Sequence, residues 1–372
     1  MYVATRVGLW VVAYCTRWLF PDDREARDAG AVVDGWQRWD WDHYLHIARD
    51  GYFPGGAGPG SPGWDNREAF FPGFPLVLRA VHAVVPSWAV SGLLVSFGAG
   101  AVAVVALARI ARHYAGGSAV VGRYAAGFFL VSPCAVFLAA GYTEALFLAC
   151  ALPAWSAALR GRWAQAGLLA AGASAVRVSG LFLAVALMVQ FAVSWAGASR
   201  RGASRARWRS AGWLVLPGVP VAAFAGFLYA RTGDWWAWRH AEERGWHREF
   251  HAPWRAWRTT WEAAFGGAYP TGYAVEWQGE LLAMAGGVVL LAVLLWRRWW
   301  AEAVYVGLTL WALGTSYWYM SVPRASLLWW PLWVLLARWA MRRPRVAWGY
   351  AAVVAPVGTV VAVAFLSGRW AG

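Results

Sequence analysis

The chain has 372 residues, of which 60% are hydrophobic and only 14% charged, with a mean hydropathy of +0.42 and a net charge of +14. A soluble globular domain has roughly 25% charged residues, so too few charges remain to cover a water-facing surface of this size. The composition excludes a soluble enzyme with a hydrophobic tail and indicates a single membrane domain over residues 1–372.

The positive charge comes from arginine alone, because the chain contains no lysine. Most arginines form clusters between apolar runs, at Arg109, Arg112 and Arg123, at Arg160 and Arg162, at Arg200, Arg201, Arg205, Arg207 and Arg209, at Arg297 and Arg298, and at Arg338, Arg342, Arg343 and Arg345. Placing these clusters in the cytoplasm satisfies the positive-inside rule at every second loop. The basic excess therefore reflects membrane topology, and we expect no nucleic-acid partner.

Apolar runs long enough to cross a bilayer recur along the whole chain. Read against the arginine clusters, they predict an all-α integral membrane bundle of about eleven transmembrane helices. The predicted helices lie near residues 2–20, 88–109, 124–140, 143–159, 163–178, 180–196, 211–231, 280–296, 302–320, 325–338 and 346–366. The stretch 163–196 is compatible with one long tilted helix. We divide it at Arg177 to Gly180 because the next arginine cluster must return to the cytoplasm.

The two ends of the predicted bundle lie on opposite sides of the membrane. Arg6 precedes a short apolar stretch without a small-residue cleavage site, so we expect a first membrane helix there, with the true start open upstream. Eleven crossings from a cytoplasmic N-terminus place the C-terminus outside. Cys15, Cys134 and Cys150 all fall in apolar runs, which indicates neither a disulfide framework nor a metal cluster.

Acidic residues are concentrated on one side of this topology, although they played no part in building it. Of the 19 Asp and Glu residues, only Glu302 falls on the cytoplasmic side. Most of the others lie in two long external segments, residues 21–87 and 232–279. Connections of this length usually carry function or are disordered, and their tryptophan content argues against disorder.

Many of the 31 tryptophans cluster in the second external segment, at Trp235, Trp236, Trp238, Trp246, Trp254, Trp257 and Trp261. One interpretation is an interfacial aromatic belt, because indole favours the headgroup region. The other is a platform that binds lipid or sugar.

The first external segment contains RWDWDHYLHIARDGY, residues 38–52. Its apolar side chains recur at helical spacing, with Asp42, His43, His46 and Asp50 opposite, which predicts a short amphipathic helix on the membrane surface. Asp40 stands just before this helix. It is placed either to cap the first amides or to accept a proton from a hydroxyl at the membrane face.

This string resembles the first-loop signature of the PIG-V mannosyltransferase family, which adds the second mannose to GPI precursors, and of its bacterial relatives. The matching residues are Arg38, Trp39, Asp40, Tyr44, Leu45, Ile47, Ala48, Gly51 and Tyr52. The following AFFPGFPLVLR resembles the next family element through Phe70, Phe71, Pro72, Phe74, Pro75 and Arg79. Arginine-only basicity and alanine-rich helices suggest a bacterial member from a high-GC genome.

Further family elements follow in the same order along the chain. SPCAVFLAAGYTEALF resembles the family's Pro-to-Ser-Glu stretch, with Thr143 in place of Ser before Glu144, and AVRVSGLFL keeps Arg177 and Gly180. The segment from TGDWW to APW resembles the second-loop pattern through Gly233, Asp234, Trp246 and Arg248. SVPRASLLWW resembles the late Ser-x-x-Arg-Tyr element at Arg324, with Ala325 where Tyr is usual.

The resemblance implies a GT-C-like glycosyltransferase of the plasma membrane. It implies transfer of mannose on the external face from a polyprenyl-phosphate donor to a glycan or glycolipid acceptor. A sugar on a lipid phosphate already has a good leaving group, so one base suffices, and Asp40 would accept the acceptor's proton in an inverting displacement without metal or cofactor. The expected substrate-binding residues are Arg38, His43, Tyr44, Arg79, Glu144, Arg177, Asp234 and Arg324.

Alternatives remain for several of these residues. Arg177 and Arg324 lie at external helix ends within apolar sequence, where a cation needs an anionic partner. For Arg177 that partner is either Glu144 or a lipid phosphate. His247 and His251 have the i, i+4 spacing of ligands on one helix face, but not the zinc-protease pattern. At the level of function, the alternative is a lipid or glycolipid transporter, which would usually carry ionisable groups near mid-membrane.

Overall fold

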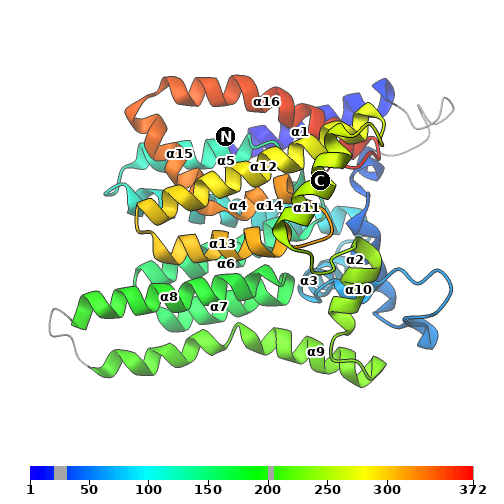
Figure 1. Ribbon diagram of the computed structural model, residues 1–372, viewed down its shortest axis with the longest axis horizontal. Helices are drawn as coiled ribbons and strands as arrows, with labels where there is room; N and C mark the ends of the chain where they lie inside the picture. Colours follow the sequence, from blue (N-terminus) through cyan, green and yellow to red (C-terminus); the bar gives the residue numbers. More distant parts are fainter. Residues whose placement is uncertain (21–31, 200–204, 372) are drawn as a thin grey trace. The chain divides into compact units, whose positions relative to one another are not determined.

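The computed structural model describes residues 1–20, 32–199 and 205–371. Of the described residues, 78% are helical and none is in a strand (Figure 1), which confirms the all-α prediction. The beginning of the first predicted external segment, residues 21–31, and Arg200 and Arg201 lie outside the described residues.

The chain forms two compact units, each assembled from separate stretches. Unit 1 comprises Met1–Arg49, Phe74–Leu152 and Leu327–Gly372, and unit 2 comprises Asp50–Gly73 and Pro153–Ser326. Both are built from apolar helices, so this division leaves the prediction of one membrane domain as it stands.

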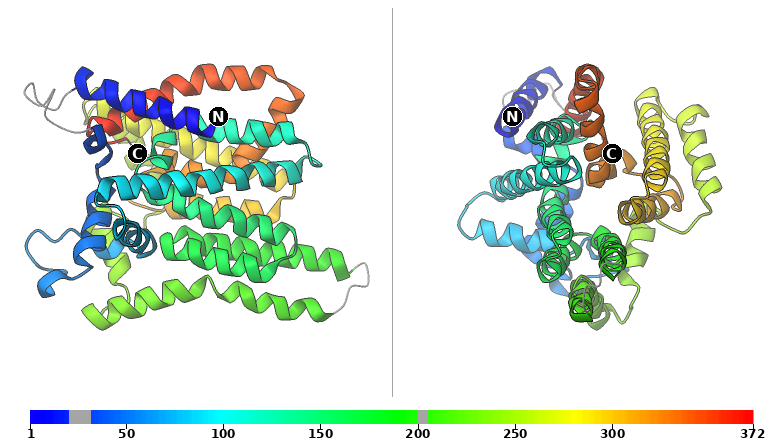
Figure 2. Two further views of the ribbon diagram at one scale, coloured as in Figure 1. Left: turned by 180° about the vertical axis from the view of Figure 1, so that it is seen from behind. Right: turned by 90° about the vertical axis from the view of Figure 1, so that its left-hand side faces the viewer.

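Unit 1 is a set of long helices joined by short turns. Its elements are α1 (Tyr2–Leu19), η2 (Val32–Trp36), α2 (Asp40–Asp50), α3 (Gly73–His82), α4 (Trp88–Tyr114), α5 (Ala119–Leu130), η5 (Ala135–Leu138), the first part of α6 (Thr143–Leu159), α15 (Trp330–Arg342) and α16 (Arg345–Leu366). Helices α4 and α5 pair and α15 packs on both, while α16 packs on α1 and η5 (Figure 2).

Unit 2 contains the other long helices and the whole of the second predicted external segment. Its elements are η3 (Pro54–Gly56), η4 (Arg67–Ala69), the second part of α6, α7 (Trp163–Val176), α8 (Ser179–Ser199), η6 (Arg205–Val215), α9 (Gly218–Thr232), α10 (Ala237–Trp246), α11 (Pro253–Phe265), α12 (Thr271–Trp296), α13 (Trp300–Gly314), α14 (Val322–Ala325) and the first residue of η7 (Ser326–Leu328). Helix α7 packs on α8 and α9, α8 on α13, and α12 on both α11 and α13.

The apolar stretch 163–196 forms two helices, as predicted. Arg177 ends α7 in an extended conformation, with φ −151° and ψ 148°. Gly180 then starts α8 so close to the backbone of Ser174 that a Cβ there would overlap it. A residue without a side chain is therefore needed for α8 to fold back directly onto α7.

Within the described part of the chain, five helical stretches are long and apolar enough to cross a membrane. They are Trp88–Tyr114, Ser179–Ala196, Arg209–Thr232, Thr271–Trp296 and Arg345–Leu366, and the shorter Ala119–Leu130 and Thr143–Leu159 are also apolar. These helices support a polytopic membrane protein. The full number of eleven crossings stays a prediction.

Several predicted helix boundaries are wrong, among them the end of the helix expected over 124–140, the start of α12 and the end of α13. The helix expected over 124–140 ends at Leu130, because Pro133 lacks an amide donor and disfavours helical geometry in the residue before it. Helix α12 begins at Thr271 rather than near residue 280. Helix α13 ends at Gly314 rather than near residue 320, since the backbone that follows bonds to the side chains of Thr260 in α11 and Glu280 in α12.

Candidate functional site

The amphipathic helix predicted in the first external segment is α2, and its apolar face is buried. Trp41, Tyr44, Ile47 and Ala48 are at most 5% exposed. Asp40 is the first residue of the helix rather than the residue before it, and it is half-buried. The carboxylate proposed as the base thus stands on an element that is anchored along its length.

Aromatic packing fixes α2 within unit 1. The ring of Trp41 lies directly against Gly92 of α4 and Gly141, and a Cβ at either glycine would overlap it. The ring of Tyr44 packs at 5.0 Å from Phe74 and at 6.0 Å from Tyr142, between ring centroids. Because these rings fill the space around α2, the helix cannot rotate about its axis without steric overlap.

The backbone just before Asp40 is fixed by hydrogen bonds. The Tyr142 hydroxyl donates to the Arg38 carbonyl at 2.6 Å. The Arg38 guanidinium donates to the Leu366 carbonyl at 3.4 Å, and the Trp39 indole to the Arg369 carbonyl at 3.2 Å. Unit 1 therefore brings the Arg-Trp-Asp segment, the segment before Glu144 and the C-terminal end of α16 together.

The other predicted site residues of unit 1 occupy different environments. His43 is half-buried on α2, and Glu144 is fully buried in the first turn of α6, where a carboxylate complements the helix dipole. Arg79 on α3 is exposed, and its guanidinium donates to the Arg49 carbonyl at 3.4 Å in the last turn of α2. Arg79 thus supports the end of the helix that begins with Asp40.

In unit 2 the second family element of the first loop meets the segment around Arg177. Gly73 approaches the Ala175 carbonyl so closely that a Cβ would overlap it. Burial raises the pKa of the Tyr52 phenol well above its ordinary value. The hydroxyl therefore stays protonated and donates to the Phe70 carbonyl at 2.6 Å. Arg177 interacts electrostatically with Tyr305 of α13.

Asp234 follows the C-terminal end of α9, where Gly233 adopts the left-handed conformation. One carboxylate oxygen accepts the Trp236 amide at 2.8 Å, and the other lies 2.6 Å from Nδ1 of His240. Burial acts to raise the pKa of Asp234, but the hydrogen bonds from His240 and Trp236 and the positive charges of His240 and Arg244 outweigh it, so this pKa is lowered. The visible role of Asp234 is to start α10.

Arg324 is buried in the short helix α14, with 7% exposure. The turn that leads into this helix rests on Glu280 of α12, whose carboxylate accepts the Ser321 and Val322 amides at 2.7 and 2.8 Å. No local sequence pattern marks Glu280, because its partners lie far along the chain. Arg177, Asp234 and Arg324 belong to unit 2, and that they face one substrate together with Asp40 stays a prediction.

The second external segment is mostly helical, and its histidines do not share a helix face. His247 is the C-cap residue of α10, with a φ of +52°, and His251 lies before the start of α11. The two histidines are therefore not on one helix, and their i, i+4 spacing does not place them on a common helix face. Among the described residues, no three His, Cys, Asp or Glu side chains gather as metal ligands would.

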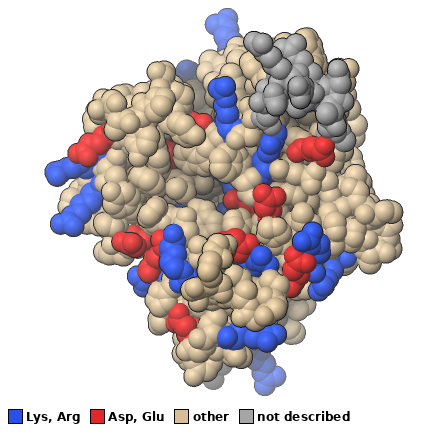
Figure 3. Space-filling model, turned by 90° about the vertical axis from the view of Figure 1, so that its right-hand side faces the viewer, with Lys and Arg blue, Asp and Glu red and all other residues tan. Residues whose placement is uncertain are grey.

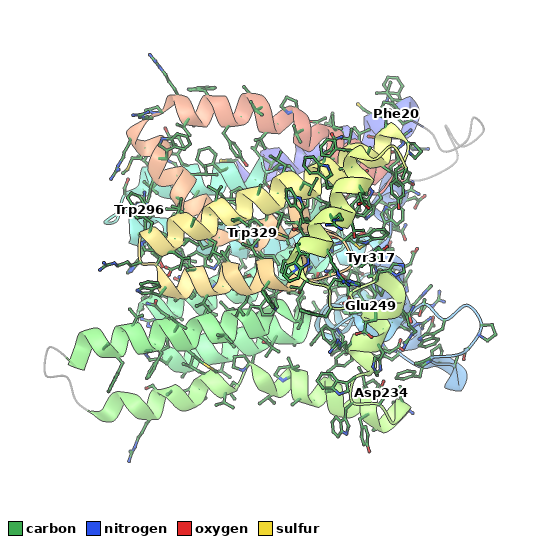
Figure 4. All side chains as sticks on the ribbon, viewed as in Figure 1. Phe20, Asp234, Glu249, Trp296, Tyr317 and Trp329 are labelled. Atoms are coloured by element: carbon green, nitrogen blue, oxygen red, sulfur yellow. The ribbon has the colours of Figure 1, made fainter. Side chains whose placement is uncertain are left out.

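Polar and aromatic side chains reach the surface at the ends of these elements. On the side drawn in Figure 3, acidic side chains lie among arginines. In unit 2, Asp234, Glu249 and Tyr317 lie at one end of the helices and Trp296 at the other (Figure 4). Trp235, Trp236, Trp254, Trp257 and Trp261 are between 41% and 70% exposed, as either interpretation of these tryptophans requires.

The fold is that of a polytopic helical membrane protein, in which unit 1 holds the fixed carboxylate of Asp40 and unit 2 holds the buried Arg324. Residues 26–196 match the family described as mannosyltransferase (PIG-V). This region, somewhat less than half of the chain, is similar to the PIG-V-type family, as the motifs indicated. The matched region contains Asp40, Glu144 and Arg177, whereas Asp234 and Arg324 lie beyond it.

Curated relatives carry the same family relationship. The chain is similar to GPI alpha-1,6-mannosyltransferase 2 of Mus musculus, with 35% identity over 168 residues, covering 42% of this chain and 32% of the relative. It is 38% identical over 149 residues to the Cricetulus griseus protein of that name, and 35% identical over 142 residues to the Homo sapiens protein. These two matches cover 37% and 35% of this chain, and 28% and 26% of the relatives. The match thus spans about a third of the relatives' length.

Proposed function

We propose that this chain is a membrane glycosyltransferase that transfers mannose from a polyprenyl-phosphate donor to an extracytoplasmic glycan or lipid-linked acceptor. Mannose is chosen because the matched family and the curated relatives are named for mannosyl transfer. The acceptor named for the relatives, GPI, is not carried over. We place the enzyme in the plasma membrane, with its active site on the outer face, on the strength of the arginine distribution.

The proposed reaction is a single displacement at the anomeric carbon. Asp40 accepts the proton of the acceptor hydroxyl while the oxygen forms the new glycosidic bond. The bond between the anomeric carbon and the phosphate oxygen breaks, and polyprenyl phosphate departs with the electron pair. Because the phosphate leaves as a stable anion, no second carboxylic acid has to protonate it, and the configuration inverts.

Arginine suits the leaving group. Its planar guanidinium binds two phosphate oxygens at once, and a buried site strengthens that attraction. We assign this role to Arg177 and Arg324. Arg38, His43, Tyr44, Arg79, Glu144 and Asp234 are assigned to holding donor and acceptor, directly or through the elements that carry Asp40 and α10.

The observation that carries this proposal is the joining, in unit 1, of the Arg-Trp-Asp segment to the segment before Glu144. The Tyr142 hydroxyl bonded to the Arg38 carbonyl links two motifs that are about 100 residues apart, and both lie within the region that matches the family. A half-buried carboxylate held this firmly is what general base catalysis requires, since the base must meet the hydroxyl at hydrogen-bond distance.

The test is Asp40→Asn in membranes supplied with polyprenyl-phosphate mannose. We expect transfer to fall by roughly 10²- to 10⁴-fold at unchanged expression, because that is the usual contribution of a general base. The matched control is Asp42→Asn, which removes an exposed carboxylate from the same helix and should leave transfer close to wild type. Full activity of Asp40→Asn would remove Asp40 from the role of base.

The second candidate function is a lipid or glycolipid transporter. It predicts movement of substrate across proteoliposome membranes without formation of a glycosidic bond. Mass spectrometry of the lipid fraction after incubation with donor separates the two functions, because only a transferase yields a product that is heavier by one hexose.

A further inference from the structure

The non-helical segment 315–321, between α13 and α14, is held by groups from the second external segment. The Thr315 carbonyl accepts the His251 amide at 2.7 Å, and the Tyr319 amide donates to the hydroxyl of Thr260 at 2.8 Å. The Arg248 guanidinium donates to the Met320 carbonyl at 3.5 Å. The segment therefore replaces helical hydrogen bonds with bonds to groups from more than 50 residues earlier in the chain.

Glu280 holds the end of this segment through two hydrogen bonds. It is 1% exposed, and each of its carboxylate oxygens accepts one backbone amide, from Ser321 at 2.7 Å and from Val322 at 2.8 Å. Ser321 has a φ of +63°, in the left-handed region that residues other than glycine rarely adopt. Such a conformation persists only where the surroundings fix it, and here the carboxylate fixes it from both sides.

The position of Arg324 depends on this turn. The Ala325 amide donates to the Ser321 carbonyl at 2.8 Å, which closes α14 directly over the residue that Glu280 holds. Arg324 thus stands on a single helical turn whose first residues are bonded to Glu280. Any rotation of Ser321 would swing the whole turn, and the guanidinium with it.

We propose that Glu280 is a positioning residue, which fixes the turn at 321–322 and so sets where the Arg324 guanidinium meets the phosphate of the donor. The inference rests on the proposed function. A carboxylate is suited to the task because it offers two acceptor oxygens and no donor, whereas an amide side chain would turn an N–H group toward one of the two backbone amides. Charged acceptors also form the stronger bonds.

The test compares Glu280→Gln with Glu276→Gln in the full-length protein, using polyprenyl-phosphate mannose as donor. Glu276 is the matched control, because it lies one turn earlier on α12 and makes no hydrogen bond through Oε2. We expect Glu280→Gln to lower kcat/KM roughly ten- to a hundredfold, mainly through a higher KM for the donor, since one buried charge-assisted bond is lost. Glu276→Gln should stay within about twofold of wild type, as a substitution away from such contacts usually does.

A double-mutant cycle with Arg324→Ala separates positioning from general destabilisation. If Glu280 acts through Arg324, Glu280→Gln should lower kcat/KM only slightly further in the Arg324→Ala background. Equal losses in both backgrounds, or no loss in either, overturn the inference. Backbone hydrogen exchange over 319–325 should rise in Glu280→Gln and not in Glu276→Gln, and unchanged exchange also overturns it.

Two further experiments distinguish failure of the positioning role of Glu280 from failure of the proposed function. If Glu280→Gln fails to accumulate, Thr260→Val removes the neighbouring acceptor of the Tyr319 amide, and a smaller loss coupled to Arg324 is expected in the same cycle. If the wild-type protein transfers no mannose, the proposed function fails. An active wild type with an uncoupled Glu280→Gln variant leaves the proposed function standing and overturns only the positioning role.

Discussion

Helix α2, which carries Asp40, is fixed mainly by aromatic packing, whereas the turn before Arg324 is fixed mainly by hydrogen bonds to polar side chains. Helix α2 rests on the rings of Trp41 and Tyr44, which fill space against glycines and other rings. The turn before Arg324 is bonded to Glu280, and the residues just before it to Thr260 and Arg248. Packing tolerates small shifts, whereas an unmade buried hydrogen bond carries the full cost of desolvation. The two regions should therefore respond differently to substitution.

Among substitutions in the packing around α2, Trp41→Ala should have the largest effect on stability and transfer. Trp41 is 1% exposed, and truncating a buried tryptophan to alanine typically costs about 3–5 kcal/mol. We expect a lower thermal midpoint in detergent and a loss of transfer comparable to that of Asp40→Asn, because α2 would lose the ring that fits between Gly92 and Gly141. Trp254→Ala, on an exposed ring of α11, is the control and should be close to neutral. Equal effects of the two substitutions would contradict the assignment of packing to α2.

The sequence predicted the packing side well. The apolar period of residues 41–48 identified α2 and its buried face, because helical periodicity is a local property of the chain. The motif at Arg38 to Asp40 pointed to the same place. The sequence does not predict that Gly92 and Gly141 lie against Trp41, since a local sequence pattern does not show which helices approach each other closely.

The hydrogen-bonded turn before Arg324 was hardly predicted from the sequence. Residues 315–320 were predicted as the end of a helix, and Glu280 as the start of another. The bonds that pull this segment out of helical geometry join residues 41 to 72 positions apart, so no window of the sequence contains both partners. Arg324 was found through its motif, and its support was found only in the structure.

Tyr142→Phe measures how much one hydrogen bond adds to the packing around α2. The ring contacts to Tyr44 and Phe365 are kept, while the bond to the Arg38 carbonyl at 2.6 Å is lost. A neutral buried bond contributes about 1 kcal/mol, so we expect transfer to fall only severalfold. Kinetics at saturating donor measures this effect. A loss as large as that of Trp41→Ala would show that hydrogen bonding, rather than packing, fixes the Asp40 region.

Asp234→Asn should have the smallest effect, a slight change in unfolding temperature. It tests whether a carboxylate must be buried to support a backbone turn strongly. Like Glu280, Asp234 accepts a backbone amide, but its side chain is 36% exposed against 1% for Glu280 as a whole. Exposed contacts of this kind contribute little, because water competes for them. Burial acts to raise the pKa of Asp234, yet the bonds from His240 and Trp236 lower it overall. A carboxylate with a lowered pKa stabilises the folded chain fully above its ordinary value of 3.8 and loses that contribution as the pH falls through the folded value.

Wild type and Asp234→Asn should therefore differ slightly in unfolding temperature at neutral pH and converge below pH 3.8. Asp42→Asn is the control, since Asp42 is exposed on α2 of the other unit. A difference that persists in acid would assign the effect to something other than the charge of Asp234. A neutral-pH difference as large as that between wild type and Glu280→Gln would break the comparison itself, because an exposed carboxylate would then support its turn as strongly as a buried one.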